Sequence, residues 1–248
     1  NATNPDQLYY DLNIGEVSSS AKTIFNLVPK NTIPKNISLP SFFTIRGAAK
    51  GTTKIVNTNL KLTSTLGNAA VIAKLDMRRK NREIYNVKAN LQNLQIGKII
   101  QNNKVGAITA QIEAKGESFD FKNANADLKG VVQSAYFNGY RYQNMNLAGK
   151  INRGVYNIVL NSKDPNANLQ LTASGKYDDK NPTVKVNGNI NKLDLNKLGF
   201  YQSPMIIAGS LDGDFTSLDP DNLNGYLNLK DFAISDTKEV YPIQEVNL

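Results

Sequence analysis

Residues 203–234, SPMIIAGSLDGDFTSLDPDNLNGYLNLKDFAI, decide the fold class because they read as two β-strands joined by a turn. In residues 207–215, apolar or small residues alternate with polar ones, which places them on one face of a strand. Residues 223–229 repeat this alternation. Between the two lies Asp-Pro-Asp-Asn at 219–222, a turn sequence, since proline fixes φ and Asx side chains bond to nearby backbone. The stretch therefore predicts an antiparallel hairpin with one apolar face.

The same alternation recurs along most of the chain. It is found at residues 9–14, 44–51, 54–66, 69–77, 85–91, 108–114, 119–121, 124–132, 145–151, 155–160, 169–175 and 184–190. Closely spaced short strands favour a continuous antiparallel meander. We therefore predict an all-β fold, an elongated and curled antiparallel sheet with short helices, continuous over residues 1–248 as a fragment of a longer protein.

Three segments interrupt the alternation. Serines precede residues 20–28, where Ile24, Leu27 and Val28 stand at i, i+3 and i+4, so we expect a short helix ending before Pro29. Residues 94–101 and 195–200 lose the period of two and are predicted to form further short helical segments.

The composition excludes several kinds of chemistry. The chain of 248 residues contains no Cys, His or Trp and has a net charge of +8. Without Cys and His it lacks the usual ligands for zinc, haem and iron–sulfur clusters, and the commonest general base. No apolar run reaches the ~20 residues that span a bilayer. We expect no metal, no cofactor and no catalytic residues, hence a protein that is not an enzyme, and the missing cysteines suit an oxidising compartment.

The chain contains an internal repeat. Residues 45–51, 108–114 and 207–213 align without gaps, and residues 87–99 match residues 186–198. Two of these matches share one offset of 99 residues: 87–99 with 186–198, and 108–114 with 207–213. A further match, of residues 128–132 with 223–227, has an offset of 95. We predict a repeat spanning about 85–132 and 184–229, with Ile45, Ile108 and Ile207 all facing the apolar interior.

Small residues alternate with large ones on the apolar face. Two sheets packed face to face would need bulky side chains throughout, so glycine and alanine here favour a sheet that curls around partly unfilled space. Glycine at bulges is the alternative interpretation. The predicted trough-lining residues share one parity on successive strands: Ile108, Ala110, Ile112, Leu128, Val132, Leu147, Leu171, Val186, Ile190, Ile207, Leu211, Leu227 and Leu229.

Residues 33–76, IPKNISLPSFFTIRGAAKGTTKIVNTNLKLTSTLGNAAVIAKLD, and residues 189–200, NINKLDLNKLGF, followed by the hairpin above, resemble the AsmA-like family, and most closely its TamB (translocation and assembly module) branch. The resemblance covers about residues 9–234. It implies a β-taco fold, an open groove with an apolar interior, and a periplasmic protein anchored in the inner membrane by a segment outside this chain. It also implies phospholipid transport to the outer membrane, or outer-membrane protein assembly beside a BamA-like (TamA-type) barrel partner.

The same residues also allow other functional hypotheses. A structural or adhesive β-solenoid that binds glycan or protein is the alternative, but a glycan binder should expose an aromatic ladder, and Trp is absent. The acidic residues at 212–221 lack the glycine and the glutamate that a calcium loop requires. Residues 136–142 could stack bases, but Asn138-Gly139 favours a type I′ hairpin there, and we expect no nucleic acid partner. The basic residues 78–82 are read as a solvated turn.

Overall fold

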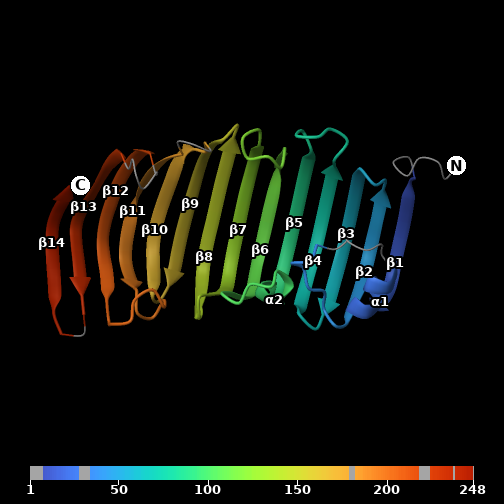
Figure 1. The fold of residues 1–248 in the computed structure, drawn as a ribbon, viewed down its shortest axis with the longest axis horizontal. Helices are drawn as coiled ribbons and strands as arrows, with labels where there is room; N and C mark the ends of the chain where they lie inside the picture. Colours follow the sequence, from blue (N-terminus) through green and yellow to red (C-terminus); the bar gives the residue numbers. More distant parts are fainter. Residues whose placement is uncertain (1–7, 28–33, 179–181, 218–223, 237, 248) are drawn as a thin grey trace.

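The computed structural model describes residues 8–27, 34–178, 182–217, 224–236 and 238–247. Fourteen strands form one sheet in chain order, and every neighbouring pair is antiparallel (Figure 1). Their bounds are β1 Tyr10–Ser19, β2 Phe43–Gly51, β3 Ile55–Ser64, β4 Gly67–Asp76, β5 Ile84–Gln95, β6 Val105–Glu117, β7 Asn125–Phe137, β8 Tyr140–Asn152, β9 Val155–Asp164, β10 Ala167–Lys176, β11 Thr183–Asp194, β12 Ile206–Ser217, β13 Asn224–Ser235 and β14 Val240–Asn247. The predicted all-β antiparallel meander is confirmed.

Two short helices lie at the lower edge of the sheet in Figure 1. Helix α1, Ala21–Leu27, begins after Ser20, whose hydroxyl accepts a hydrogen bond from the Thr23 N–H at 3.2 Å. Helix α2, Ile96–Ile99, is a single turn between β5 and β6. Both helices were predicted from the sequence, and both are confirmed.

The third predicted helix, at residues 195–200, is wrong, because this segment is a compact turn. The Leu198 N–H donates to the Asp194 carbonyl at 3.0 Å, as in a helix, but the Phe200 N–H reaches back five residues to Leu195. Gly199 has φ +77°, which ends the helical path. Leu198 is fully buried, so the turn closes the lower edge beneath β11 and β12.

The hairpin predicted at Asn138-Gly139 is confirmed. The two residues have φ of 49° and 83° and join β7 to β8 as a two-residue loop of type I′. This loop pairs Phe137 with Tyr140, and Tyr136 with Arg141. Tyr136 and Tyr140 therefore lie on opposite faces of the sheet, although the hairpin sequence on its own suggests that they lie near one another across the strands.

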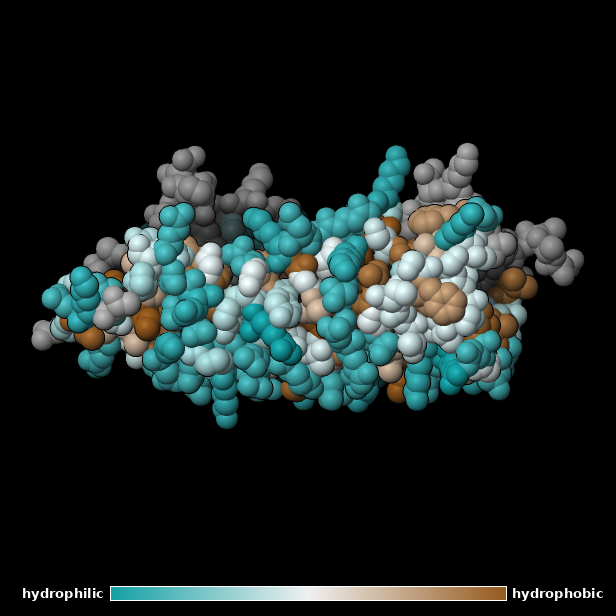
Figure 2. All heavy atoms as spheres, turned by 90° about the horizontal axis from the view of Figure 1, so that it is seen from below, coloured by the Kyte–Doolittle hydropathy of each residue, from teal (hydrophilic) through white to brown (hydrophobic). Residues whose placement is uncertain are grey.

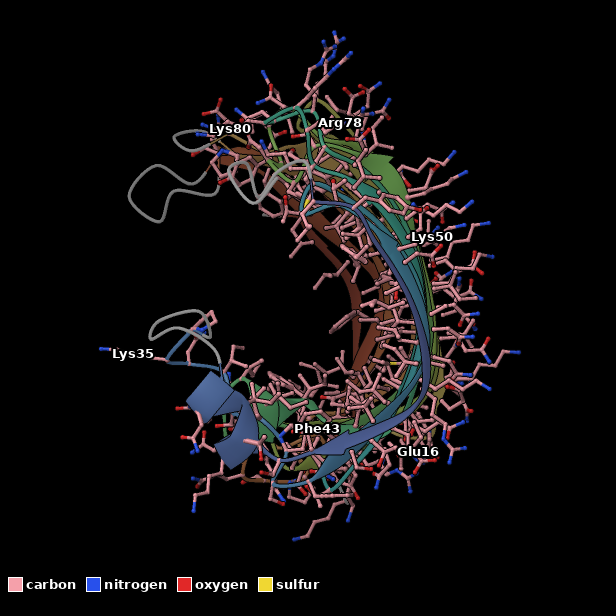
Figure 3. All side chains as sticks on the ribbon, turned by 90° about the vertical axis from the view of Figure 1, so that its right-hand side faces the viewer. Glu16, Lys35, Phe43, Lys50, Arg78 and Lys80 are labelled. Carbon is pink, nitrogen blue, oxygen red and sulfur yellow. The ribbon has the colours of Figure 1, made fainter. Side chains whose placement is uncertain are left out.

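The sheet curls into a crescent without a second layer. Figure 3, seen along the row of strands, shows the crescent open on one side. The accessible surface is 16374 Å², whereas a globular protein of 27.3 kDa has about 10,900 Å². Among the described residues only a few apolar side chains are fully enclosed, and the largest of these is Leu198. The architecture is an extended sheet around a hollow, and not a filled sandwich.

The pairing of β5 with β6 is repeated 99 residues later in the pairing of β11 with β12. A register shift separates Leu91, paired with Ala110, from Leu94, paired with Ile108. The same shift separates Ile190, paired with Gly209, from Leu193, paired with Ile207.

The following strands also differ by 99 residues, because Leu128 pairs with Ala114 and Leu227 pairs with Gly213. The offset of 95 read from the sequence for this strand is therefore wrong. Alternating apolar residues match equally well at offsets that differ by an even number of residues, such as 95 and 99, and only the register distinguishes them.

Candidate functional site

The two faces of the sheet are assigned from β2. Phe43 points into the hollow, while Lys50 and Glu16 point away from it (Figure 3). Strand β2 pairs with β3 without a register shift, so its odd-numbered residues face the hollow and its even-numbered residues face outward. Directly paired residues share a face, which extends the assignment from strand to strand. We call the inner, concave face the trough.

A continuous apolar row crosses the trough from β1 to β13. Each member is directly paired with the next, and every member is aliphatic or glycine: Ile14, Gly47, Leu60, Val71, Ala89, Ile112, Gly130, Leu147, Leu160, Leu171, Gly188, Leu211 and Leu229. We call this set the central row. It gives the trough an unbroken apolar floor along the long axis of the molecule.

The structure places all the predicted trough-lining residues on this concave face. The central row contains Ile112, Leu147, Leu171, Leu211 and Leu229. Leu128, Val186 and Leu227 lie in the next row toward the upper edge, and Ala110, Val132 and Ile190 lie in the next row toward the lower edge. Ile108 and Ile207 lie closest to the lower edge, beside Leu94 and Leu193.

Most of these side chains are only half-buried. Ala110 is fully buried, Leu128 is 39% exposed, and the other predicted residues fall between these limits. Neighbours in the sheet cover their flanks, while their tips face the hollow. Apolar surface left in water costs roughly 25 cal/mol per Å², so an apolar ligand that fills the hollow gains this free energy.

Two glycines of the trough leave room above the floor. A Cβ built on Gly130 would lie 3.8 Å from its nearest neighbour, the Leu147 Cβ, and one on Gly149 would lie 3.8 Å from the Leu128 Cβ. Neither glycine has the positive φ that excludes larger residues. The space at these positions is therefore a feature of the hollow, and side chains can be introduced there.

A pocket of about 320 Å³ opens in the trough near the upper edge. Its apolar lining on the concave face comes from Tyr85, Phe119, Phe121, Ala126, Leu128, Ile151, Tyr156 and Ile158. The rings of Tyr85 and Phe119 stack with centroids 5.0 Å apart. Burial raises the pKa of both Tyr85 and Tyr156, which indicates a poorly hydrated environment. We call this the aromatic pocket.

The loop that supplies the two phenylalanines, residues 118–124, is held by hydrogen bonds. The Ser118 N–H donates to the Glu83 carbonyl at 2.8 Å. The Asp120 carboxylate accepts from the Lys122 N–H at 3.1 Å and from the Asn123 side chain at 2.6 Å. Phe119 remains 61% exposed and Phe121 48% exposed. This loop thus presents two apolar rings to solvent at the upper edge of the sheet, where the crescent opens. We call this edge the upper lip and the opposite edge the lower lip.

The convex face carries a ladder of charges. Lys88 lies 2.9 Å from Glu113, and Asp127 lies between Lys115 and Lys150, at 3.6 and 3.9 Å. All are cross-strand neighbours. Exposed pairs of this kind add little stability individually, but their charges make the convex face hydrophilic. Figure 2, seen from below, shows that hydrophilic side chains also dominate the lower edge, with smaller hydrophobic patches.

A fully buried carboxylate lies at the lower edge of the concave face, because Asp164 shares the parity of Leu160 and Ser162 in β9. Asp164 is fully buried at the β9–β10 turn, where it accepts hydrogen bonds from the Tyr140 hydroxyl at 2.7 Å and from the N–H groups of Gln143 and Asn166, each at 2.8 Å. Burial, and then the bond to Asp164, raise the pKa of Tyr140. Because the carboxylate is saturated with donors from the turn and from β8, its role is to fix the lower edge.

Sequence reasoning missed part of the site. The predicted lining began at Ile108, although Leu60 and Val71 belong to the central row, and the alternation at residues 54–77 could have identified them. It also missed the aromatic pocket, for which the chain offers no local signal, since Tyr85 and Phe119 meet only through the register.

The remaining expectations concern metals and membranes. Asp212 accepts a hydrogen bond from the Tyr226 hydroxyl at 3.2 Å, and Asp214 pairs with Lys185 at 3.4 Å, both on the convex face. The rest of that acidic stretch, residues 218–223, lies outside the described residues. Over the ranges that the structure describes, no group of acidic residues could hold a metal ion, and no helix is long and apolar enough to cross a membrane.

Comparison of the chain with protein-family models, with curated proteins and with solved structures gives no match. A functional assignment must therefore rest on the trough and on the resemblance of the sequence motifs. The trough is the feature that requires an explanation, because it is apolar, continuous from β1 to β13 and open on one side.

Proposed function

We propose that the trough binds the acyl chains of lipids, and that the protein is a periplasmic part of a TamB/AsmA-like chain that carries phospholipid between the inner and outer membranes. The observation that carries this proposal is the central row, an aliphatic floor that continues through thirteen directly paired positions from Ile14 to Leu229. The resemblance of residues 33–76 and 189–234 to that family supports the same function.

The energetics favour a chain-like ligand over a compact one. Each CH₂ group that leaves water gains about 0.8 kcal/mol, so a ligand gains most when it lies along an elongated apolar floor. The half-buried Leu147 and Leu171 present their tips to such a ligand without any gap in the row. A rigid polar ligand such as a glycan would find hydrogen-bonding groups on the convex face and few on this floor.

The open side of the crescent suits an amphiphile. Lys80 lies at the upper lip and Lys35 at the lower lip, on either side of the opening (Figure 3). A lipid whose chains lie on the floor can keep its polar head at this opening, in water and near these cations. The polar group then avoids the desolvation cost that a closed cavity would impose.

The proposal is tested by filling the floor without changing its polarity. Gly149→Leu adds bulk inside the trough, whereas Ala148→Leu adds the same side chain on the convex face of the same strand. Purified protein is incubated with phosphatidylcholine vesicles, separated from them, and the lipid it holds is counted by mass spectrometry. We expect Gly149→Leu to lower the lipid content and Ala148→Leu to leave it unchanged. Equal lipid content in both variants and the wild type, or none in the wild type, would contradict the proposal.

A further inference from the structure

The aromatic pocket lies directly beside a cluster of cations. Strand β4 ends at Asp76, β5 begins at Ile84, and the turn between them contains Arg78, Arg79, Lys80 and Arg82. We call residues 78–82 the basic turn. Tyr85, which stacks on Phe119 in the pocket, follows this turn by three residues. The hydrogen bond from Ser118 to the Glu83 carbonyl ties the phenylalanine loop to the same segment.

The cations of the basic turn fall into two groups. Arg78 forms hydrogen bonds with the Asp76 carboxylate, with its Nε 2.9 Å from Oδ1, and Arg82 lies 3.3 Å from Glu117. Arg79 and Lys80 are exposed and have no ion pair with any described residue. Arg78 and Arg82 balance Asp76 and Glu117, which leaves Arg79 and Lys80 with the single carboxylate of Glu83 and hence a surplus of positive charge for an anion.

The turn itself has a defined shape. The Arg82 N–H donates to the Arg79 carbonyl at 3.1 Å, and the Asn81 N–H donates to the Glu83 carboxylate at 2.9 Å. Asn81 adopts φ +61°, a conformation that Asn tolerates in turns. Figure 3 shows Lys80 at the lip on the open side of the crescent, whereas Arg78 points upward from the edge. Lys80 therefore stands at the boundary between the trough and water, and Arg79, the next residue in the turn, lines a cavity at the upper edge with Asp76, Arg82 and Glu117.

We infer that the basic turn and the aromatic pocket together form a binding site for an anionic phospholipid at the upper lip. The inference rests on the proposed function and specifies its substrate class. An acyl chain enters the pocket of about 320 Å³ beside Tyr85, Phe119 and Phe121, and the phosphate and an anionic headgroup face Arg79 and Lys80. Aromatic rings suit this boundary because their apolar faces contact chains while their edges tolerate water. The site therefore selects lipids with a net negative charge over zwitterionic ones.

The test measures this selection directly. Purified protein is loaded from vesicles that contain equal parts of phosphatidylcholine and phosphatidylglycerol with the same chains, and mass spectrometry gives the ratio of the two lipids held. We expect the wild type to be enriched in phosphatidylglycerol. The double variant Arg79→Gln/Lys80→Gln should lose this enrichment by roughly fivefold per cation at low ionic strength, with total lipid unchanged.

The matched control is Lys61→Gln/Lys74→Gln, which removes two exposed cations from the convex face and changes the net charge equally. It should keep the enrichment of the wild type. A second variant, Phe119→Ser/Phe121→Ser, should lower the amount of both lipids. Loss of enrichment in the Lys61/Lys74 control would show that overall charge, and not this lip, sets the preference.

The remaining outcomes separate this inference from the proposed function. Lipid held without enrichment, or enrichment that survives Arg79→Gln/Lys80→Gln, overturns the inference alone. A wild type that holds no lipid overturns both. Inorganic phosphate, titrated calorimetrically at constant ionic strength, should give no saturable binding. Saturable binding that is lost in the double variant would indicate a site for free phosphate instead of a lipid headgroup.

Discussion

Leu171 of β10 lies over Gly188 of β11, and a Cβ at position 188 would come within 2.8 Å of the Leu171 Cδ2 and 2.1 Å of the Gln170 carbonyl oxygen. The two residues are directly paired in the central row. The large side chain thus occupies the space that the small one leaves. The floor stays continuous at Gly188 because the side chain of Leu171 covers the glycine.

This relationship predicts opposite effects of one substitution at two glycines. Gly188→Ala forces Leu171 and the backbone to move and should destabilise the protein by about 1–3 kcal/mol. Gly130→Ala makes an ordinary contact with the Leu147 Cβ at 3.8 Å and should leave stability unchanged or raise it by about 0.4–1 kcal/mol, because the unfolded chain loses freedom. Urea denaturation followed by far-UV circular dichroism measures both. Equal losses of stability would show that the packing at Gly188 has no special role.

Asp164 should contribute strongly to stability. Asp164→Ala leaves the Tyr140 hydroxyl and the N–H groups of Gln143 and Asn166 without their acceptor in a buried turn. Each such group costs about 1–3 kcal/mol when it is left unsatisfied. Asp127→Ala, on the exposed convex face, serves as the control and should change the free energy of unfolding by less than about 1 kcal/mol. A small effect of Asp164→Ala would mean that water replaces the carboxylate.

The basic turn predicts a measurable titration. Hydrogen bonding from the Arg78 side chain, and then from its backbone N–H, lowers the pKa of Asp76 from 3.8 to about 2. A depressed pKa in the folded state stabilises the protein above the unfolded value, and this contribution is lost as the pH falls from about 4 to about 2. Arg78→Gln should return the pKa of Asp76 toward 3.8. Carboxyl chemical shifts followed by NMR test this, and an unchanged pKa would assign the shift to other groups.

Charge within the trough should abolish lipid loading. Leu211→Arg places a cation in the central row, whereas Ser210→Arg places it on the convex face of the same strand. Leu211 is only half-buried, so the protein is expected to fold with a modest loss of stability, while an acyl chain would have to desolvate the guanidinium. Lipid content by mass spectrometry should fall in Leu211→Arg alone. Equal lipid content in the two variants would argue against binding on the floor.

The alternation of the sequence predicted the strands and their inner face, because a period of two fixes which side each residue occupies. Ile112, Leu147, Leu171 and Leu211 thus fall in one row although they are far apart in the chain. The helix at 20–28 was predictable from its capping serine and its apolar spacing, and α1 begins directly after Ser20.

Three features could not be predicted from the sequence, because they depend on the strand register or on the backbone conformation of single residues. The bulge between Leu91 and Leu94 adds residues without a compositional signal. The segment 195–200 has the spacing of a helix, yet Gly199 turns the chain away. The contact of Tyr85 with Phe119 requires knowledge of how the loop after β6 returns over the trough. The last of these features forms part of the aromatic pocket, so that site emerged only from the structure.

The most direct test of lipid binding uses the absence of tryptophan from the chain. A single Trp introduced as Leu171→Trp reports from the trough, and one introduced as Gln170→Trp reports from the convex face of the same strand. Each variant is loaded with phospholipid that carries bromine on its acyl chains, and Trp fluorescence is compared with that of protein loaded with unbrominated lipid. The account predicts strong quenching at position 171 and none at position 170. Equal quenching at both positions, or none at 171 in protein that holds lipid, would contradict it.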